Sequence, residues 1–228
     1  MSRLPDPLSR RDRQRQTREA LVFAARAVFA RDGYHGANLE GIAREAGFSK
    51  GAVYSNFAGK ADLFLAVMDA NIEAALADGG WDVFDREAPE ESEDPELVGA
   101  MKGFALATLE FVAAAARDER LSGEMAKRMQ VLTDTYATVA RDSRAEDEPL
   151  EDGELGALLT ALDQGAALLT LAGSVAVDQR VLRAGMQRLL DPAGTRGGAT
   201  GPGAPGAGAL HPEVIQRRIA EALRPNQS

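Results

Sequence analysis

The apolar positions of this chain recur at helical spacing over most of its length. Between residues 18 and 32 they follow the i, i+4, i+7, i+8 pattern of one helix face, at Leu21, Ala25, Val28 and Phe29. Gly33 comes next, and glycine often ends a helix because the left-handed conformation costs it little. The pattern therefore predicts a first helix that stops at Gly33.

Two short helices joined by a tight turn are predicted next. Asn38 is placed to cap a helix over residues 39–46, and Ser49 is placed to cap a helix that runs to Phe57. Only residues 47–49 link the two helices. So short a link between short helices is typical of a helix-turn-helix.

Further amphipathic stretches predict helices at residues 60–77, 95–117, 125–139, 154–172 and 178–190. The acidic segment 78–95 is rich in Gly and Pro and predicts a loop. Few stretches have the Val-, Ile-, Thr- and aromatic-rich character of strands. The predicted fold class is therefore all-α.

Charge is divided unevenly along the chain. Residues 1–60 hold 11 lysines and arginines against 6 acidic residues, whereas the remainder holds 15 against 29. Such asymmetry suggests a basic module for a polyanion joined to an acidic module. A basic tail without a partner is the alternative that charge alone leaves open.

Composition excludes several kinds of chemistry. The absence of cysteine removes disulfides, thiol catalysis and thiolate metal sites, and the only histidines are His35 and His211. The N-terminus lacks the apolar core of a secretory signal, and no uninterrupted apolar run reaches the ~18 residues of a membrane span. We therefore expect a cytoplasmic protein with no cofactor, no metal and no membrane partner.

One combined pattern is specific to a known family. It consists of Ile42-Ala43, Ala46-Gly47, Ser49-Lys50-Gly51, Tyr54, Phe57 and Lys60. Together these residues resemble the DNA-binding domain of TetR-family regulators, over roughly residues 15–75. The resemblance implies an N-terminal three-helix helix-turn-helix DNA-binding domain followed by an α-helical ligand-binding and dimerisation domain. It also implies a transcriptional regulator, by family default a repressor, that a small effector releases from a palindromic DNA operator.

This resemblance and the composition together divide the chain into five parts. They are a basic flexible arm (1–14), the helix-turn-helix domain (15–75), a helical effector-binding and dimerisation domain (76–190), a Gly/Pro-rich linker (191–210) and a C-terminal helix or tail (211–228). The linker is expected to be flexible because its composition buries too little surface to order it.

The expected DNA contacts lie around the second and third predicted helices, at Asn38, Ser49, Lys50, Gly51, Ala52, Tyr54, Ser55, Asn56 and Lys60. Small residues let a recognition helix approach the bases, Lys50 suits guanine acceptors, and Tyr54 and Lys60 suit phosphates. The structural alternatives are a core role for Tyr54, a purely capping Ser49 and a solvated Lys60. The family more often has Thr in place of Asn38 and His in place of Asn56, which leaves the operator sequence open.

The acidic part is expected to supply a homodimer interface and an effector pocket. The helices of this part carry more apolar residues than one packed face needs. Two helices of each subunit are therefore expected to form a four-helix bundle. Its expected contacts are Leu158, Leu162, Leu169, Leu182, Met186 and Leu189. The pocket candidates are adaptable side chains suited to an unknown, largely apolar small-molecule effector: Met101, Phe104, Phe111, Met125, Met129 and Tyr136. For both sets, burial in the core of a monomer is the alternative.

Two other functional classes compete with this interpretation. An enzyme is disfavoured because the sequence has no nucleophile–base pair, no phosphate-binding glycine loop and no metal-ligand cluster. An activator, or a ligand-independent helix-turn-helix regulator that acts through protein contacts, is compatible with the same motif.

Removal of residues 1–14 is expected to weaken DNA binding, because these arginines can follow the phosphates or enter the minor groove. Affinity measured over a range of salt concentrations should depend less steeply on salt than that of the full chain. An unchanged salt slope would contradict a DNA-binding role for this segment.

Overall fold

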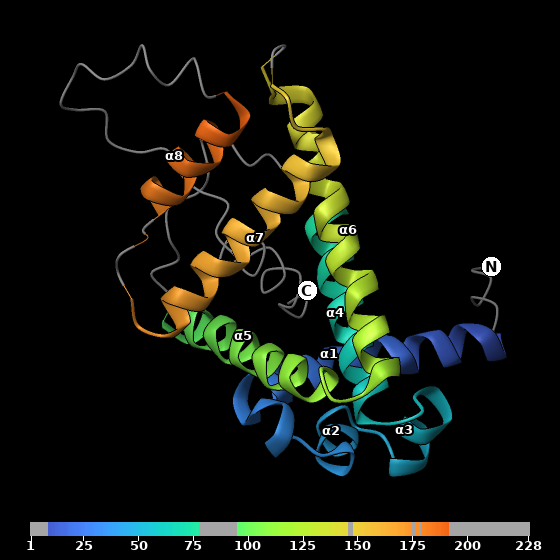
Figure 1. Cartoon of the computed structure of the whole chain (residues 1–228). Coiled ribbons are helices and arrows are strands. Elements are labelled where there is room, and N and C mark those ends of the chain that lie inside the picture. Colours follow the sequence, from blue (N-terminus) through green and yellow to red (C-terminus); the bar gives the residue numbers. More distant parts are fainter. Residues whose placement is uncertain (1–8, 78–94, 146–147, 175–176, 178, 192–228) are drawn as a thin grey trace, which may run out of the picture.

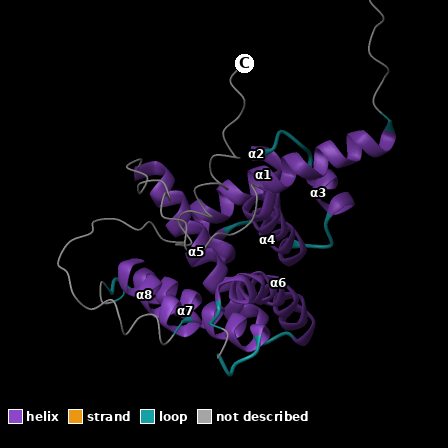
Figure 2. Cartoon of the chain, turned by 90° about the horizontal axis from the view of Figure 1, so that it is seen from above, coloured by secondary structure: helices purple, strands orange, loops and turns teal. Residues whose placement is uncertain are grey.

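The computed structural model describes residues 9–77, 95–145, 148–174, 177 and 179–191, and every regular element within them is an α-helix (Figures 1 and 2). The helices are α1 (Arg10–Gly36), α2 (Leu39–Glu45), α3 (Lys50–Asn56), α4 (Lys60–Ala77), α5 (Pro95–Ala115), α6 (Glu119–Ser143), α7 (Asp152–Leu171) and α8 (Gln179–Leu190). The all-α prediction is confirmed. The loop predicted at 78–95, the linker at 191–210 and the segment 211–228 lie almost entirely outside the described residues.

The first helix begins earlier than its apolar pattern predicts. Ser9 caps it, because its hydroxyl accepts a hydrogen bond from the Asp12 amide while the Asp12 carboxylate accepts one from the Ser9 amide. Residues 10–14, predicted as part of a flexible arm, are therefore helical. The prediction followed hydrophobic periodicity, which this polar, arginine-rich stretch lacks. The predicted break at Gly33 is confirmed by its φ of 73°.

The first of two hydrophobic cores does not stop at the predicted domain boundary near residue 75. It joins α1–α4 to Ala107, Phe111 and Ala115 of α5 and to Leu121 at the start of α6. The helix-turn-helix part is therefore built around a core that α5 completes.

A second core joins α6, α7 and α8, which lie together on one side of the molecule in Figure 2. It includes Leu182 and Met186, which are only 3% and 2% exposed. Both were predicted at the dimer interface. They instead pack inside one protomer, because the apolar face of α8 covers α7.

Two glycines allow helices to approach at backbone distance. A Cβ atom on Gly103 of α5 would lie 2.0 Å from the carbonyl oxygen of Ala30 in α1, and one on Gly156 of α7 would lie 2.7 Å from that of Thr133 in α6. No side chain fits at such distances. The α1–α5 and α6–α7 pairs therefore form the most intimate contacts between helices.

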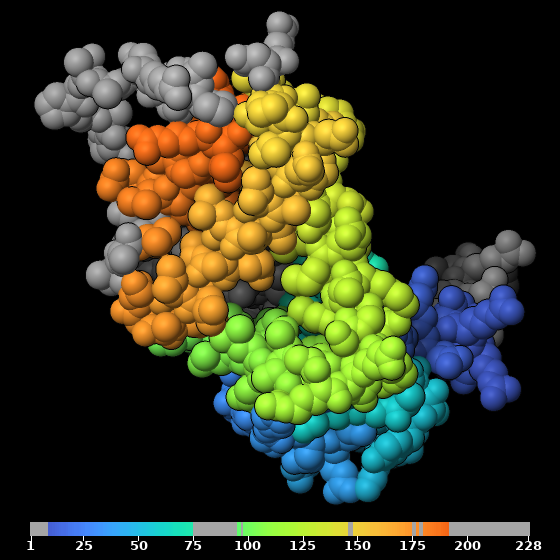
Figure 3. All heavy atoms as spheres, viewed as in Figure 1, coloured from blue at the N-terminus to red at the C-terminus, as the bar shows by residue number. Residues whose placement is uncertain are grey.

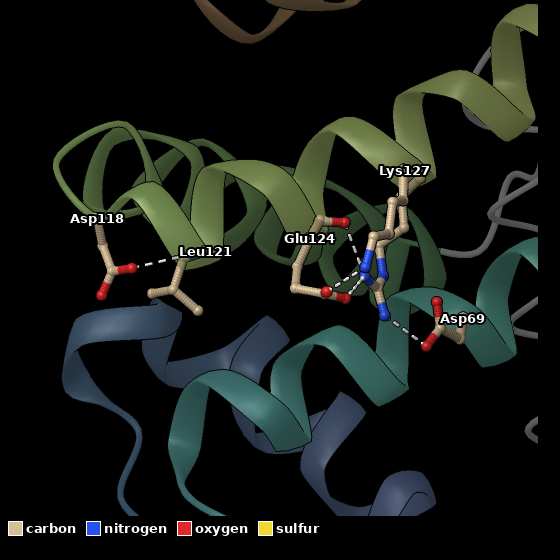
Figure 4. A network of polar contacts seen from close by, with 6 residues as sticks. Asp69, Asp118, Leu121, Glu124 and Lys127 are labelled. Carbon is tan, nitrogen blue, oxygen red and sulfur yellow. Dashed lines mark hydrogen bonds and ion pairs between the residues drawn. The ribbon is translucent and has the colours of Figure 1, made fainter.

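A mostly buried arginine ties α6 to α4. Arg128 contacts Asp69 of α4 at 2.6 Å and Glu124 of its own helix at 3.3 Å (Figure 4). Lys127 and Arg128 together hold the pKa of Glu124 below its ordinary value. Because one of the two carboxylates belongs to α4, the pair fixes the position of α6 beside it.

By composition alone, Val98–Ala115 of α5 is long and apolar enough to cross a membrane. Lys102 and Glu110 interrupt this stretch, which is why it is absent from the uninterrupted runs of the sequence. One face of the helix packs Gly103, Ala107 and Phe111 toward α1, while Leu106, Leu109 and Val112 are exposed.

Substitution Gly103→Ala is expected to lower the free energy of unfolding by about 1–3 kcal/mol, because the new methyl group must push α1 and α5 apart. Gly99→Ala is the matched control, since nothing lies within 4 Å of its Cβ position on the same helix. Urea denaturation should show Gly99→Ala to be at least as stable as the wild type, because alanine favours a helix over glycine. Equal effects of the two substitutions would contradict the close helix contact.

Candidate nucleic-acid interface

The link between α2 and α3 is a tight turn with both helix starts capped. The Asn38 side chain accepts a hydrogen bond from the Gly41 amide at 2.8 Å, and the Ser49 hydroxyl accepts one from the Ala52 amide at 3.3 Å. Gly47 has a φ of 74°, which lets the chain reverse between the helices. The predicted helix-turn-helix is confirmed, with Asn38 and Ser49 as its caps.

The inner face of α3 is anchored in the first core. Val53 is fully buried, and Phe57, which follows the helix, is 2% exposed. The guanidinium of Arg18 lies 4.3 Å from the centre of the Phe57 ring and donates to the Asn56 carbonyl at 2.8 Å. Arg18 therefore holds the end of α3 against α1.

The outer face of α3 is open to solvent. Gly51 and Ser55 are exposed, and Tyr54 is 54% exposed, which excludes the alternative that Tyr54 is a core residue. Lys50 forms an ion pair with Glu40 of α2 and lies 5.9 Å from the Tyr54 ring centre. The pair lowers the pKa of Glu40 and raises that of Lys50. The basic group nearest the start of α3 is thus partly neutralised.

Two residues predicted to contact DNA are hydrogen-bonded to the backbone of their own helix. The Ser55 hydroxyl donates to the Ala52 carbonyl at 2.9 Å, and the Asn56 amide donates to the same oxygen at 2.8 Å. Ala52 itself is half-buried. Ser55 and Asn56 must leave this carbonyl before their donors can reach DNA.

Lys60, at the start of α4, is held by the end of α1. Its ammonium donates to the carbonyls of His35 and Ala37 at 3.1 and 3.0 Å, and it lies 4.8 Å from the Tyr34 ring centre. Burial lowers its pKa. Lys60 therefore fastens α4 to the end of α1, and its contact with a DNA phosphate stays a prediction.

The end of α1 is also held by α5. The Glu110 carboxylate accepts a hydrogen bond from the His35 amide at 2.8 Å. The Tyr34 ring packs edge-on against Phe64 of α4 and Phe111 of α5, with ring centres 5.2 and 5.1 Å apart. We refer to Tyr34, Lys60, Phe64, Glu110 and Phe111 as the junction cluster.

The predicted effector-pocket residues are divided between the two cores. Phe104 and Phe111 stack on Phe64, and Met125 packs against the same first core. Tyr136 is fully buried in the second core beside Asp163, whose pKa burial raises to about 6. These four side chains are therefore divided between two hydrophobic cores of the described residues, and an effector pocket on them stays a prediction.

The two other pocket candidates are also covered to different degrees. Met101 is 6% exposed, and Met129 is half-buried. In the part of the chain that the structure describes, no three His, Asp or Glu side chains gather in a way that could hold a metal ion.

Three residues that matter at this interface were not singled out by the sequence. Glu40 neutralises Lys50, Arg18 supports the end of α3, and Glu110 binds the end of α1. Glu40 lies ten positions before Lys50 and Arg18 lies 38 before Asn56, so no local pattern reports these contacts.

Residues 21–67 match the sequence profile of bacterial regulatory proteins of the tetR family. The transcriptional activator FasR of Mycolicibacterium smegmatis is 40% identical over 58 residues, which are 25% of this chain and 26% of FasR. The regulator UidR of Escherichia coli K12 is 26% identical over 163 residues, covering 58% of this chain and 83% of UidR. The chain spans between a quarter and two fifths of the length of FasR and of the Pseudomonas regulators TtgW and SrpR.

Solved structures share the fold. A TetR-family regulator from Rhodococcus sp. superposes with a TM-score of 0.54 at 20% identity, over 76% of this chain and 95% of that protein. GusR of Salmonella enterica superposes with a TM-score of 0.50 at 20% identity, over 83% of this chain and 99% of GusR.

Lys60→Met is expected to lower the free energy of unfolding by about 1–3 kcal/mol, because two carbonyls lose their donor. Lys50→Met, which changes an exposed lysine, should alter stability by less than about 0.5 kcal/mol. Chemical denaturation of both variants measures the difference. A Lys60→Met protein as stable as the wild type would contradict the structural role of Lys60, and a reduced salt slope of its DNA binding would support the phosphate contact.

Proposed function

We propose that this chain, which belongs to the TetR family of bacterial regulatory proteins, regulates transcription by binding a double-stranded DNA operator through α2 and α3. The observation that carries the proposal is the capped helix-turn-helix itself. One face of α3 is buried through Val53, while the opposite face presents Gly51 and Tyr54 to solvent. A short helix with one buried face and one solvent-exposed face has the form that enters a major groove.

The open face suggests a division of roles among its residues. Gly51 and Ala52 are small enough to let the backbone approach the bases, and the Tyr54 hydroxyl can donate to a phosphate. To contact DNA, Lys50 would release Glu40 and bind a phosphate or a guanine instead. The phosphates of DNA would attract the Lys50 ammonium more strongly than one exposed carboxylate does. The exposed arginines at the start of α1, from Arg10 onward, supply further positive charge.

Homodimerisation through α7 and α8 is part of the proposal. Leu158, Leu168 and Leu169 of α7 are 43%, 51% and 44% exposed, and α7 lies at the surface between α8 and α6 in Figure 3. Ala157, Ala161 and Gly165 are also exposed on α7, so two copies can approach closely. Leu162 and Leu189 are half-buried and would contribute less. A dimer matches two operator half-sites about one helical turn apart.

Regulation is proposed to follow the family default, with a repressor released by a small, largely apolar effector. Leu106, Leu109 and Val112 of α5 and Val131 of α6 are 37–42% exposed and offer apolar surface for such a ligand. An effector would act by favouring a spacing of the two α3 helices that no longer fits the operator.

Activation is the second candidate, since FasR carries the name of an activator. We propose a cytoplasmic location and no catalytic activity.

Selection of bound duplexes from a random DNA pool tests the proposed function. Enrichment of a palindrome with half-sites about 10 base pairs apart is expected. Lys50→Ala combined with Tyr54→Ala should abolish the enrichment, whereas Val131→Ala, far from α3, should preserve it. Failure of the wild-type protein to enrich any site would overturn the proposal.

Leu168→Glu is expected to convert a dimer to a monomer, because it places a charge on the apolar α7 surface. Val131→Glu is the matched control, since it introduces the same charge at an exposed apolar position of α6. Sedimentation velocity should show the smaller species only for Leu168→Glu, while its far-ultraviolet circular dichroism spectrum stays that of the wild type. A dimer that persists in Leu168→Glu would exclude α7 as the interface.

A further inference from the structure

A groove of about 570 Å³ runs between α1 and α4. Its apolar wall includes Val22, Ala66 and Ala70, and two of its basic residues are Arg18 and Arg26. The groove is separate from α5, where an effector is expected. It lies within the helices that carry the DNA-binding face.

Arg26 is the unusual residue of this groove. Its side chain is buried, with only 8% of the residue exposed, and its Nε atom has no hydrogen-bond acceptor. No carboxylate in the described part of the chain forms an ion pair with it. Burial lowers the pKa of Arg26 to about 10, so the guanidinium is charged at neutral pH. A buried charge without a partner is costly, which favours an anionic ligand beside it.

The acidic residues of the groove do not supply this partner. Asp69 is bound by Arg128 at 2.6 Å, and Glu19 lies 3.8 Å from Arg15. Glu73 is exposed. These carboxylates would repel a multiply charged phosphate. The groove therefore suits a ligand that carries one negative charge, placed at Arg26, and an apolar body that lies against Val22, Ala66 and Ala70.

We propose that the groove between α1 and α4 binds a small organic monocarboxylate, with its carboxylate on Arg26 and its apolar body along α4. A bidentate contact from a guanidinium is the geometry that carboxylates prefer.

The site is coupled to the DNA-binding face through Arg18. This residue lines the groove, donates to the Asn56 carbonyl and covers Phe57. An occupant that draws Arg18 into the groove removes this support from the end of α3. This consequence rests on the proposed function, because it requires α3 to read DNA. By linkage, operator DNA and the carboxylate then change each other's affinity by the same factor.

Isothermal titration of the full chain with octanoate and with benzoate, without DNA, tests the site. Octanamide and benzamide serve as neutral controls of matched shape. At least one carboxylate should bind saturably, and its amide should bind at least ten-fold more weakly. Arg26→Gln should weaken carboxylate binding at least ten-fold, whereas Arg13→Gln, which removes an exposed charge outside the groove, should not.

Ala70→Leu provides a second variant that keeps Arg26 and fills the groove. It should also weaken binding at least ten-fold while circular dichroism and thermal unfolding remain those of the wild type. The proposal is overturned if neither carboxylate binds, if the amides bind equally well, or if Arg26→Gln and Ala70→Leu bind like the wild type. Because no DNA is present, a failure here is distinct from a failure to select an operator.

Discussion

The Glu110 carboxylate of α5 accepts a hydrogen bond from the His35 backbone amide, directly after the point where Gly33 interrupts α1. A Cβ atom at Gly33 would lie 2.7 Å from this carboxylate, so glycine at this position leaves room for the contact. Lys60 holds the same turn from the other side through the His35 and Ala37 carbonyls. The junction cluster thus supplies an acceptor for the His35 amide and a donor for these two carbonyls.

The position of α2 and α3 depends on this turn. Asn38, the cap of α2, follows Ala37 directly, so the direction in which α2 and α3 leave α1 is set where Lys60 and Glu110 act. Because Phe111 packs on Tyr34 and Gly103 lies against Ala30, α5 is part of the support of the proposed DNA-binding face. Under the proposed function, a movement of α5 would reach α2 and α3 through these packed side chains.

The features that the sequence predicts well are local. The caps at Asn38 and Ser49, the break at Gly33 and the short turn before α3 each depend on residues within a few positions of one another, so their side-chain chemistry reports them directly. The prediction failed where distant residues meet. Glu110 lies 75 positions from His35, and the burial of Leu182 depends on how α8 packs on α7.

Lys60 illustrates how a motif residue can have structural contacts that its motif does not report. Its place after Phe57 suggests a phosphate contact, and the structure adds the Tyr34 ring and two carbonyls as neighbours of its ammonium. The first core also extends onto α5, which apolar periodicity cannot reveal because it shows that a face is buried and not what covers it. For the same reason the sequence grouped Phe111 and Tyr136 in one pocket, although they belong to different cores.

Amide hydrogen exchange, measured residue by residue in the wild type and in Glu110→Gln, tests most directly whether α5 holds the DNA-binding helices in position. Loss of the carboxylate should speed exchange at His35 and Ala37, and also in α2 and at the start of α4, because all of them depend on the same turn. Exchange in α7 and α8 should stay unchanged. Faster exchange confined to the His35 amide would contradict the claim that the junction cluster supports α2 and α3.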